Sequence, residues 1–169
     1  MLIVFGGLPG TGKTTISRLV AGRLNATCLR IDAIEQAIRD TMTGAEIGAS
    51  GYAVAQAIAE ANLGDGRSVV VDCVNPVAAS RSGWHRIATA RAALLIDVEV
   101  ICSDLAEHRR RVTTRAADIP GLALPSWEAV MSHRYEAWDR PRLIVDTAKL
   151  FPAEAAEAIL QAVTEKTGG

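Results

Sequence analysis

Short runs of apolar, often β-branched residues alternate along the chain with longer alanine-rich stretches. The short runs predict five strands, which we place at Leu2 to Phe5, Thr27 to Ile31, Ser68 to Asp72, Leu95 to Ile101 and Leu143 to Asp146. Strands that alternate with helices are typical of units that build a parallel sheet covered on both faces. The pattern therefore predicts an α/β fold around a central, mainly parallel five-stranded sheet.

The longer stretches predict seven helices. They cover Lys13 to Leu24, Ala33 to Asp40, Ala45 to Leu63, Pro76 to Ala92, Asp104 to Arg115, Ser126 to Trp138 and Pro152 to Thr164. The segment Ala116 to Pro125 contains two prolines and a glycine, so we expect it to be irregular and exposed. With the end of the preceding helix it forms a candidate lid over residues 111–125. No repeat or interdomain linker is evident, which predicts one domain over residues 1–169.

Composition and charge narrow the function classes. Of 169 residues, 49% are hydrophobic and 22% are charged, which is typical of a folded globular chain. The formal net charge of −1 supplies no general field for a polyanion, so a nucleic-acid partner is not expected. No apolar run approaches the roughly 20 residues that span a bilayer, and the amino terminus lacks the pattern of a secretory signal. We expect a cytoplasmic protein without a membrane partner, whose cysteines, Cys28, Cys73 and Cys102, are reduced and buried.

The segment from Gly7 to Thr14, Gly-Leu-Pro-Gly-Thr-Gly-Lys-Thr, matches the P-loop pattern G-x-x-x-x-G-K-[ST] between a predicted strand and a predicted helix. Glycines let such a loop curl so that its amide groups face a polyphosphate. Lys13 would reach the β and γ phosphates, and the Thr14 hydroxyl would coordinate Mg²⁺. The motif predicts a P-loop NTPase fold, a three-layer α/β/α sandwich, that binds ATP and Mg²⁺. The predicted nucleotide-binding residues are Gly7, Leu8, Pro9, Gly10, Thr11, Gly12, Lys13, Thr14 and Thr15.

Two aspartates follow predicted strands at the edge of the sheet where ligands gather in such folds. Asp32 follows the second strand, where a carboxylate can accept the proton of a substrate hydroxyl. Alternatively, Asp32 is a helix cap, because Glu35 stands three residues later. Asp72 ends the run Val69 to Asp72, which resembles a Walker B segment, and we assign it with Thr14 to Mg²⁺, directly or through water.

Several arginines lie near the candidate lid. Arg111 and Arg115 are four residues apart, share a helix face and are candidates for stabilising charge on the transferred phosphoryl group. A solvated helix face is the alternative, and it suits Arg109 and Arg110. Arg81, on an earlier helix pattern, is interpreted as a solvated arginine.

The order of P-loop, Asp32, Asp72, arginine-rich helix and lid resembles the small P-loop kinases. These include gluconate, shikimate and adenylylsulfate kinases, chloramphenicol phosphotransferase-like enzymes and the kinase domain of polynucleotide kinases. The resemblance implies that Asp32 is the general base, that Arg111 and Arg115 are lid arginines, and that the loop after Asp146 contacts adenine. Glu35 stands where polynucleotide kinases carry an arginine for the substrate phosphate, which disfavours a nucleic-acid 5′-hydroxyl as acceptor.

The sequence thus predicts an ATP-dependent kinase that transfers the γ-phosphoryl group to a hydroxyl of a small molecule, with Lys13, Asp32, Arg111 and Arg115 as catalytic residues. A nucleotide-binding regulator, or slow ATPase, that acts by changing conformation is the alternative. A GTPase is disfavoured because the chain lacks an N/T-K-x-D segment. The acceptor and the oligomeric state stay open.

Overall fold

A computed structural model of the chain describes residues 1–42 and 47–168. Its five strands are β1 (Leu2–Gly6), β2 (Thr27–Arg30), β3 (Val69–Asp72), β4 (Leu95–Ile101) and β5 (Leu143–Asp146). They form one sheet in the order β2-β3-β1-β4-β5, and every neighbouring pair is parallel. Each predicted strand is confirmed, with ends that differ by no more than one residue.

The helices alternate with these strands. They are α1 (Lys13–Leu24), α2 (Ile31–Thr41), α3 (Ser50–Gly64), α4 (Ala78–Ala90), α5 (Leu105–Thr114), α6 (Trp127–Met131) and α7 (Pro152–Thr167). The helix that we predicted from Ala45 therefore begins at Ser50, and its expected residues 45 and 46 lie outside the described part of the chain. Along the described residues, no helix is both long and apolar enough to cross a bilayer.

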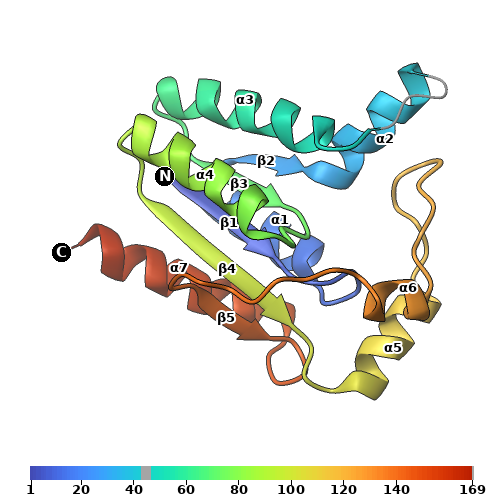
Figure 1. The fold of residues 1–169 in the computed structure, drawn as a ribbon. Coiled ribbons are helices and arrows are strands. Elements are labelled where there is room, and N and C mark those ends of the chain that lie inside the picture. Colours follow the sequence, from blue (N-terminus) through green and yellow to red (C-terminus); the bar gives the residue numbers. More distant parts are fainter. Residues whose placement is uncertain (43–46, 169) are drawn as a thin grey trace.

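Alternate residues of β1 face the two sides of the sheet, because successive side chains of a strand point in opposite directions. Ile3 and Phe5 pack with residues of α1 and α7, whereas Leu2 and Val4 pack with residues of α3 and α4. All four side chains are fully buried, and burying a side chain of this kind stabilises a fold by roughly 1.5–3 kcal/mol. Helices thus cover both faces of the sheet (Figure 1), which confirms the three-layer α/β/α sandwich.

The strand register places several polar residues at one edge of the sheet. Asp72, the last residue of β3, lies opposite Phe5 on one side and Arg30 on the other. Phe5 is followed directly by Gly6 and the P-loop, and Arg30 by the first turn of α2. Because all strands are parallel, their carboxyl ends meet at this edge, so the P-loop, Asp72 and Arg30 are neighbours.

The predicted helix from Ser126 to Trp138 is largely wrong, because α6 ends at Met131. The backbone after α6 is held instead by a side chain of α4. The Arg81 guanidinium, from α4, donates to the carbonyl oxygens of Glu136 at 2.7 Å and Ala137 at 2.9 Å. These carbonyls are held by a side chain instead of by helical amides, so tertiary contacts outweigh the local helix preference.

Arg81 itself corrects a second expectation. Arg81 is only 1% exposed, although we predicted a solvated arginine. The guanidinium also donates to the carbonyl oxygen of Asn75, and it lies 4.2 Å from the centroid of the Trp138 ring. Aromatic faces attract cations, and a guanidinium that is fully hydrogen-bonded loses little on burial.

The cysteines are only partly as expected. Cys73 and Cys102 are buried, but Cys28 is exposed. Cys28 lies on β2, an edge strand, with its neighbour Leu29 facing the core. All three thiols are free among the described residues.

Candidate active site

The P-loop has a backbone that only glycine accommodates at key points. Gly7 and Gly10 have φ angles of +133° and +86°, in the region that side chains rarely adopt. A Cβ atom on Gly7 would clash with the Val100 carbonyl oxygen, and one on Gly10 would clash with Val112 of α5. The loop therefore curls against both β4 and α5, and its shape is fixed by contact on two sides.

Lys13, the first residue of α1, is 7% exposed, and its ammonium donates to the Leu8 carbonyl oxygen at 2.8 Å. Burial lowers the pKa of Lys13, while the carboxylates of Asp72 and Asp32 act in the opposite direction. A buried ammonium that is held over its own loop is placed to meet phosphate oxygens there.

Thr14 and Asp72 meet across the P-loop. The Thr14 hydroxyl donates to Asp72 Oδ2 at 2.6 Å, and Asp72 is 4% exposed. Burial raises the pKa of Asp72, against the opposing effects of Lys13 and of the Thr14 hydrogen bond. A hydroxyl and a carboxylate at this distance are hard oxygen ligands, so the pair fits Mg²⁺ that is held mainly by substrate phosphates and water.

Asp32 lies in the first turn of α2, and Arg30 occupies the N-cap position. The interpretation of Asp32 as the helix cap is therefore wrong, because Arg30 and not Asp32 is at the N-cap, and the helix has no side-chain capping hydrogen bond there. The Asp32 side chain is 46% exposed and lines the same cleft as the P-loop. It is thus available for a ligand in that cleft.

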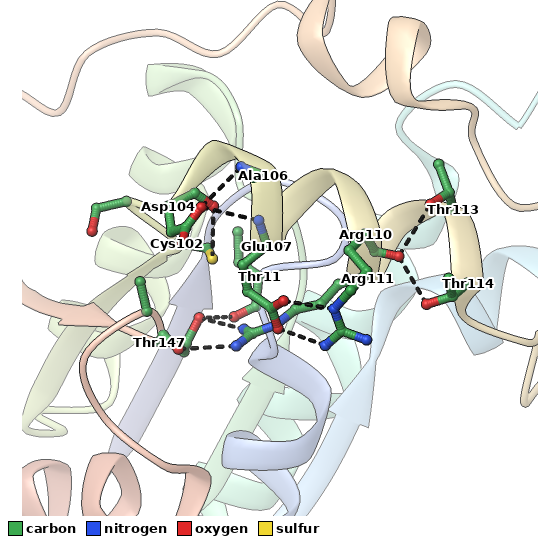
Figure 2. Close-up of polar contacts among 12 residues, drawn as sticks. Thr11, Cys102, Asp104, Ala106, Glu107, Arg110, Arg111, Thr113, Thr114 and Thr147 are labelled. Atoms are coloured by element: carbon green, nitrogen blue, oxygen red, sulfur yellow. Dashed lines mark hydrogen bonds and ion pairs between the residues drawn. The ribbon is translucent and has the colours of Figure 1, made fainter.

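Arg111 connects α5 to the P-loop through Thr147 (Figure 2). Its guanidinium donates to the Thr147 hydroxyl at 2.8 Å, to the Thr147 carbonyl oxygen at 3.0 Å and to Glu107 at 2.7 Å. The Thr147 hydroxyl in turn donates to the Thr11 carbonyl oxygen at 2.9 Å. On α5, His108 donates to the Pro9 carbonyl oxygen at 2.9 Å. The base of the candidate lid is therefore attached to the phosphate loop.

Arg115, the residue that caps α5 at its carboxyl end, has a different environment. Its buried Nε has no hydrogen-bond partner among the described residues. Burial lowers the pKa of Arg115, and the carboxylates of Asp32 and Asp118 oppose this effect. Arg111 and Arg115 both line the cleft, but Arg111 is hydrogen-bonded to Thr147 whereas the Arg115 side chain forms no hydrogen bond among the described residues.

The segment from Ala116 to Pro125 is irregular, as predicted, and connects α5 with α6 (Figure 1, amber). It is anchored by Asp118, whose carboxylate lies 2.7 Å from Arg30 Nη1 and 3.0 Å from Arg18 Nη2. The sequence patterns did not single out Arg30, Arg18 or Asp118 as site residues. Arg30 could have been found, because it is a charged residue at the end of a predicted strand, two positions before Asp32. No sequence pattern pointed to Asp118. Closure of the segment stays a prediction.

The predicted site residues meet around one cleft of about 750 Å³. Its wall includes the predicted residues Pro9, Gly10, Gly12, Lys13, Thr14, Thr15, Asp32, Asp72, Arg111 and Arg115. Gly7, Leu8 and Thr11 are not part of the wall; Thr11 shapes the loop instead, with its hydroxyl donating to the Leu8 carbonyl oxygen at 2.9 Å.

The sheet order and the P-loop define a nucleotide-binding protein of P-loop kinase-like fold. The family model of the AAA domain, AAA_33, matches residues 2–133, and the chain belongs to this family. No curated protein shows a significant match.

Solved structures agree with this class. A gluconokinase from Sinorhizobium meliloti 1021 has a TM-score of 0.67 at 21% identity, and the match covers 98% of this chain and 94% of that one. APS kinase from Mycobacterium tuberculosis, in complex with AMPPNP and APS, has a TM-score of 0.70 at 18% identity and coverages of 96% and 96%. Kti12 from Chaetomium thermophilum, in complex with ADP-AlF3, has a TM-score of 0.70 at 21% identity, with coverages of 96% and 99%. The predicted resemblance to small P-loop kinases is confirmed at the level of the fold.

Proposed function

We propose that the protein is a kinase that binds ATP with Mg²⁺ at the P-loop and transfers the γ-phosphoryl group to a hydroxyl of a small molecule. One observation carries the proposal: Lys13, the Thr14–Asp72 pair and Asp32 line a single cleft. Phosphoryl transfer needs positioned charges around the phosphates and a group that accepts the proton of the acceptor. This cleft offers both.

The residues have distinct roles in the proposed reaction. The P-loop amides and Lys13 bind the β and γ phosphates and stabilise the charge that develops on them. Thr14 and Asp72 would hold Mg²⁺, which would neutralise phosphate charge. Asp32 takes the proton of the acceptor hydroxyl. The hydroxyl oxygen of the acceptor forms a bond to the γ-phosphorus while the bond between the γ-phosphorus and the bridging oxygen of ADP breaks. Arg115 lines the cleft, and its guanidinium stabilises charge on the transferred group.

The size of the cleft favours a small acceptor. A volume of about 750 Å³ must contain the triphosphate as well as the acceptor. The proposed partners are therefore ATP and a small hydroxyl compound.

Acceptor-dependent ADP formation tests the proposal. Purified protein with Mg·ATP is assayed against pooled hydroxyl metabolites, in parallel with Asp32→Asn and with Asp65→Asn, an exposed aspartate in the turn after α3. We expect one pool to stimulate ADP release in the wild type and in Asp65→Asn but not in Asp32→Asn. Nucleotide binding with slow, acceptor-independent hydrolysis would instead support a nucleotide-binding regulator.

A further inference from the structure

One guanidinium, that of Arg30, contacts three carboxylates in the cleft. Its Nη1 lies 2.7 and 2.8 Å from the two oxygens of Asp118. Its Nη2 lies 3.7 Å from Asp32 Oδ2, and its Nε lies 3.7 Å from Asp72 Oδ2. The Arg30 side chain is 15% exposed, and its Nε is buried without a hydrogen-bond partner among the described residues. The arginine therefore lies between the lid segment and both functional aspartates.

The sheet fixes this position. Arg30 ends β2 directly opposite Asp72 of β3, so the two side chains meet through strand register. Asp32 and Asp72 carry like charges in a partly desolvated cleft, where such charges repel strongly. A planar guanidinium has five donors in a fixed arrangement, so it can face several carboxylates at once, which a lysine ammonium cannot do with the same geometry.

Asp118 has a second arginine partner, Arg18. Arg18 Nη2 lies 3.0 Å from Asp118 Oδ2, and Arg18 belongs to α1, the helix that begins at the P-loop. The lid segment is thus fastened to α1 and to β2 by one carboxylate. The partners lie 100 and 88 residues away from it in sequence.

We propose that Arg30 is a positioning residue that couples docking of the segment 116–125 to the arrangement of Asp32 and Asp72. The coupling arises because Asp118 competes with these aspartates for one guanidinium. With the segment docked, Asp118 makes the short contacts, and Asp32 keeps a longer one that leaves its oxygens available for a proton. With the segment released, the guanidinium is drawn wholly to Asp32 and Asp72. The roles of Asp32 and Asp72 rest on the proposed function, whereas the docking contact does not.

The docking half is tested without any activity, by ¹⁵N order parameters of the backbone amides in residues 117–124. We expect Asp118→Asn and Arg30→Gln each to lower these values from near those of rigid backbone towards those of flexible loops, about 0.6 or below. The double variant should be no lower than Asp118→Asn alone, because that change already breaks the contact between Arg30 and Asp118. Arg30→Lys should be intermediate. Glu157→Gln is the matched control. Glu157 is an exposed carboxylate whose oxygen lies 2.6 Å from Arg23 Nη1, and neither residue lines the cleft.

The positioning half is tested by turnover of Mg·ATP with water as the acceptor, at saturating nucleotide. Asp118→Asn releases the segment but leaves the Arg30 guanidinium beside Asp32 and Asp72, whereas Arg30→Gln also removes its contacts to both aspartates. We expect a fall of severalfold in kcat for Asp118→Asn and a further fall of roughly tenfold for Arg30→Gln, the effect of losing a charged contact, with small changes in KM for ATP. Arg30→Lys should restore part of kcat.

The outcomes are separable. Unchanged order parameters in a folded Asp118→Asn protein overturn the docking contact. Equal kcat values for Arg30→Gln and Asp118→Asn overturn the coupling to the aspartates. A wild-type protein that binds Mg·ATP, keeps the expected order-parameter pattern and transfers no phosphoryl group contradicts the proposed function and leaves the docking contact standing.

Discussion

The two sides of the cleft are built in different ways. The nucleotide side, Gly7 to Thr15, is one continuous stretch whose shape is set by backbone torsions and by packing against β4 and α5. The acceptor side consists of Arg30, Asp32 and Asp118, which come from a strand, a helix and an irregular segment and meet through charged side chains. Packed backbone resists displacement, whereas an ion pair that water still reaches, such as Arg30 with the half-exposed Asp118, contributes only about 1 kcal/mol.

This difference predicts how the sides respond to change. Alterations of the nucleotide side should reduce binding and chemistry together, because the loop that binds phosphates also stabilises the transferred group. Alterations of the acceptor side should reduce transfer and leave nucleotide affinity in place.

The largest effect is expected on the nucleotide side, from Lys13→Ala. The change deletes the buried ammonium and keeps a residue that favours helix, so the fold should survive. We expect transfer to fall at least about a thousandfold and ATP affinity to fall with it, as for loss of a strong charge stabiliser. Steady-state kinetics and calorimetric titration with Mg·AMPPNP measure both. A folded Lys13→Ala protein with normal activity would be incompatible with a P-loop mechanism.

Asp32→Asn is the matching change on the acceptor side. The amide keeps the size of the carboxylate but cannot take a proton, so transfer should fall roughly a hundredfold or more, the range for loss of a general base. Titration with Mg·AMPPNP should give nearly the wild-type affinity. A parallel loss of affinity would show that the two sides are not independent, and normal transfer would remove Asp32 from catalysis.

Arg111 and Arg115 allow the comparison within one helix. Arg115→Ala should lower the transfer rate at least roughly tenfold, the effect of one charged hydrogen bond, with little change in ATP affinity. Arg111→Ala should mainly weaken ATP binding, because it removes the guanidinium that holds Thr147, the hydrogen-bond donor to the P-loop carbonyl of Thr11. Arg109→Ala, on the exposed face of α5, is the control. If both variants behave alike, the assignment of Arg111 to the nucleotide side is wrong.

The smallest effect is expected when the pH is lowered and the affinity for Mg·AMPPNP is measured. Asp72 must be ionised to assist Mg²⁺, and its pKa is raised above the usual 3.8 by burial. Affinity for Mg·AMPPNP should therefore decline as pH falls towards this raised pKa, beginning at a higher pH than an aspartate with the usual pKa would allow. Titrations of Asp72→Asn at the same pH values isolate the protonation of the nucleotide itself. Identical pH dependence in the two proteins would mean that Asp72 stays ionised over the range.

Local signals account for what the sequence predicts well. The strands and the P-loop follow from apolar runs and from glycines whose positive φ angles the loop requires. Long-range contacts explain the failures. The helix expected up to Trp138 is replaced by backbone that Arg81 binds from α4, and the partnership of Arg30 with Asp118 joins residues 88 positions apart. A single sequence carries no pattern for either contact.

The fate of the γ-phosphoryl group tests the proposed function most directly. The protein is incubated with γ-labelled Mg·ATP and the acceptor pool that stimulates ADP release, and the products are separated. A kinase of the proposed kind places the label in a phosphate ester of one small hydroxyl compound, and Asp32→Asn greatly reduces this product. Label that appears only as inorganic phosphate, at a rate that no acceptor changes, would contradict phosphoryl transfer.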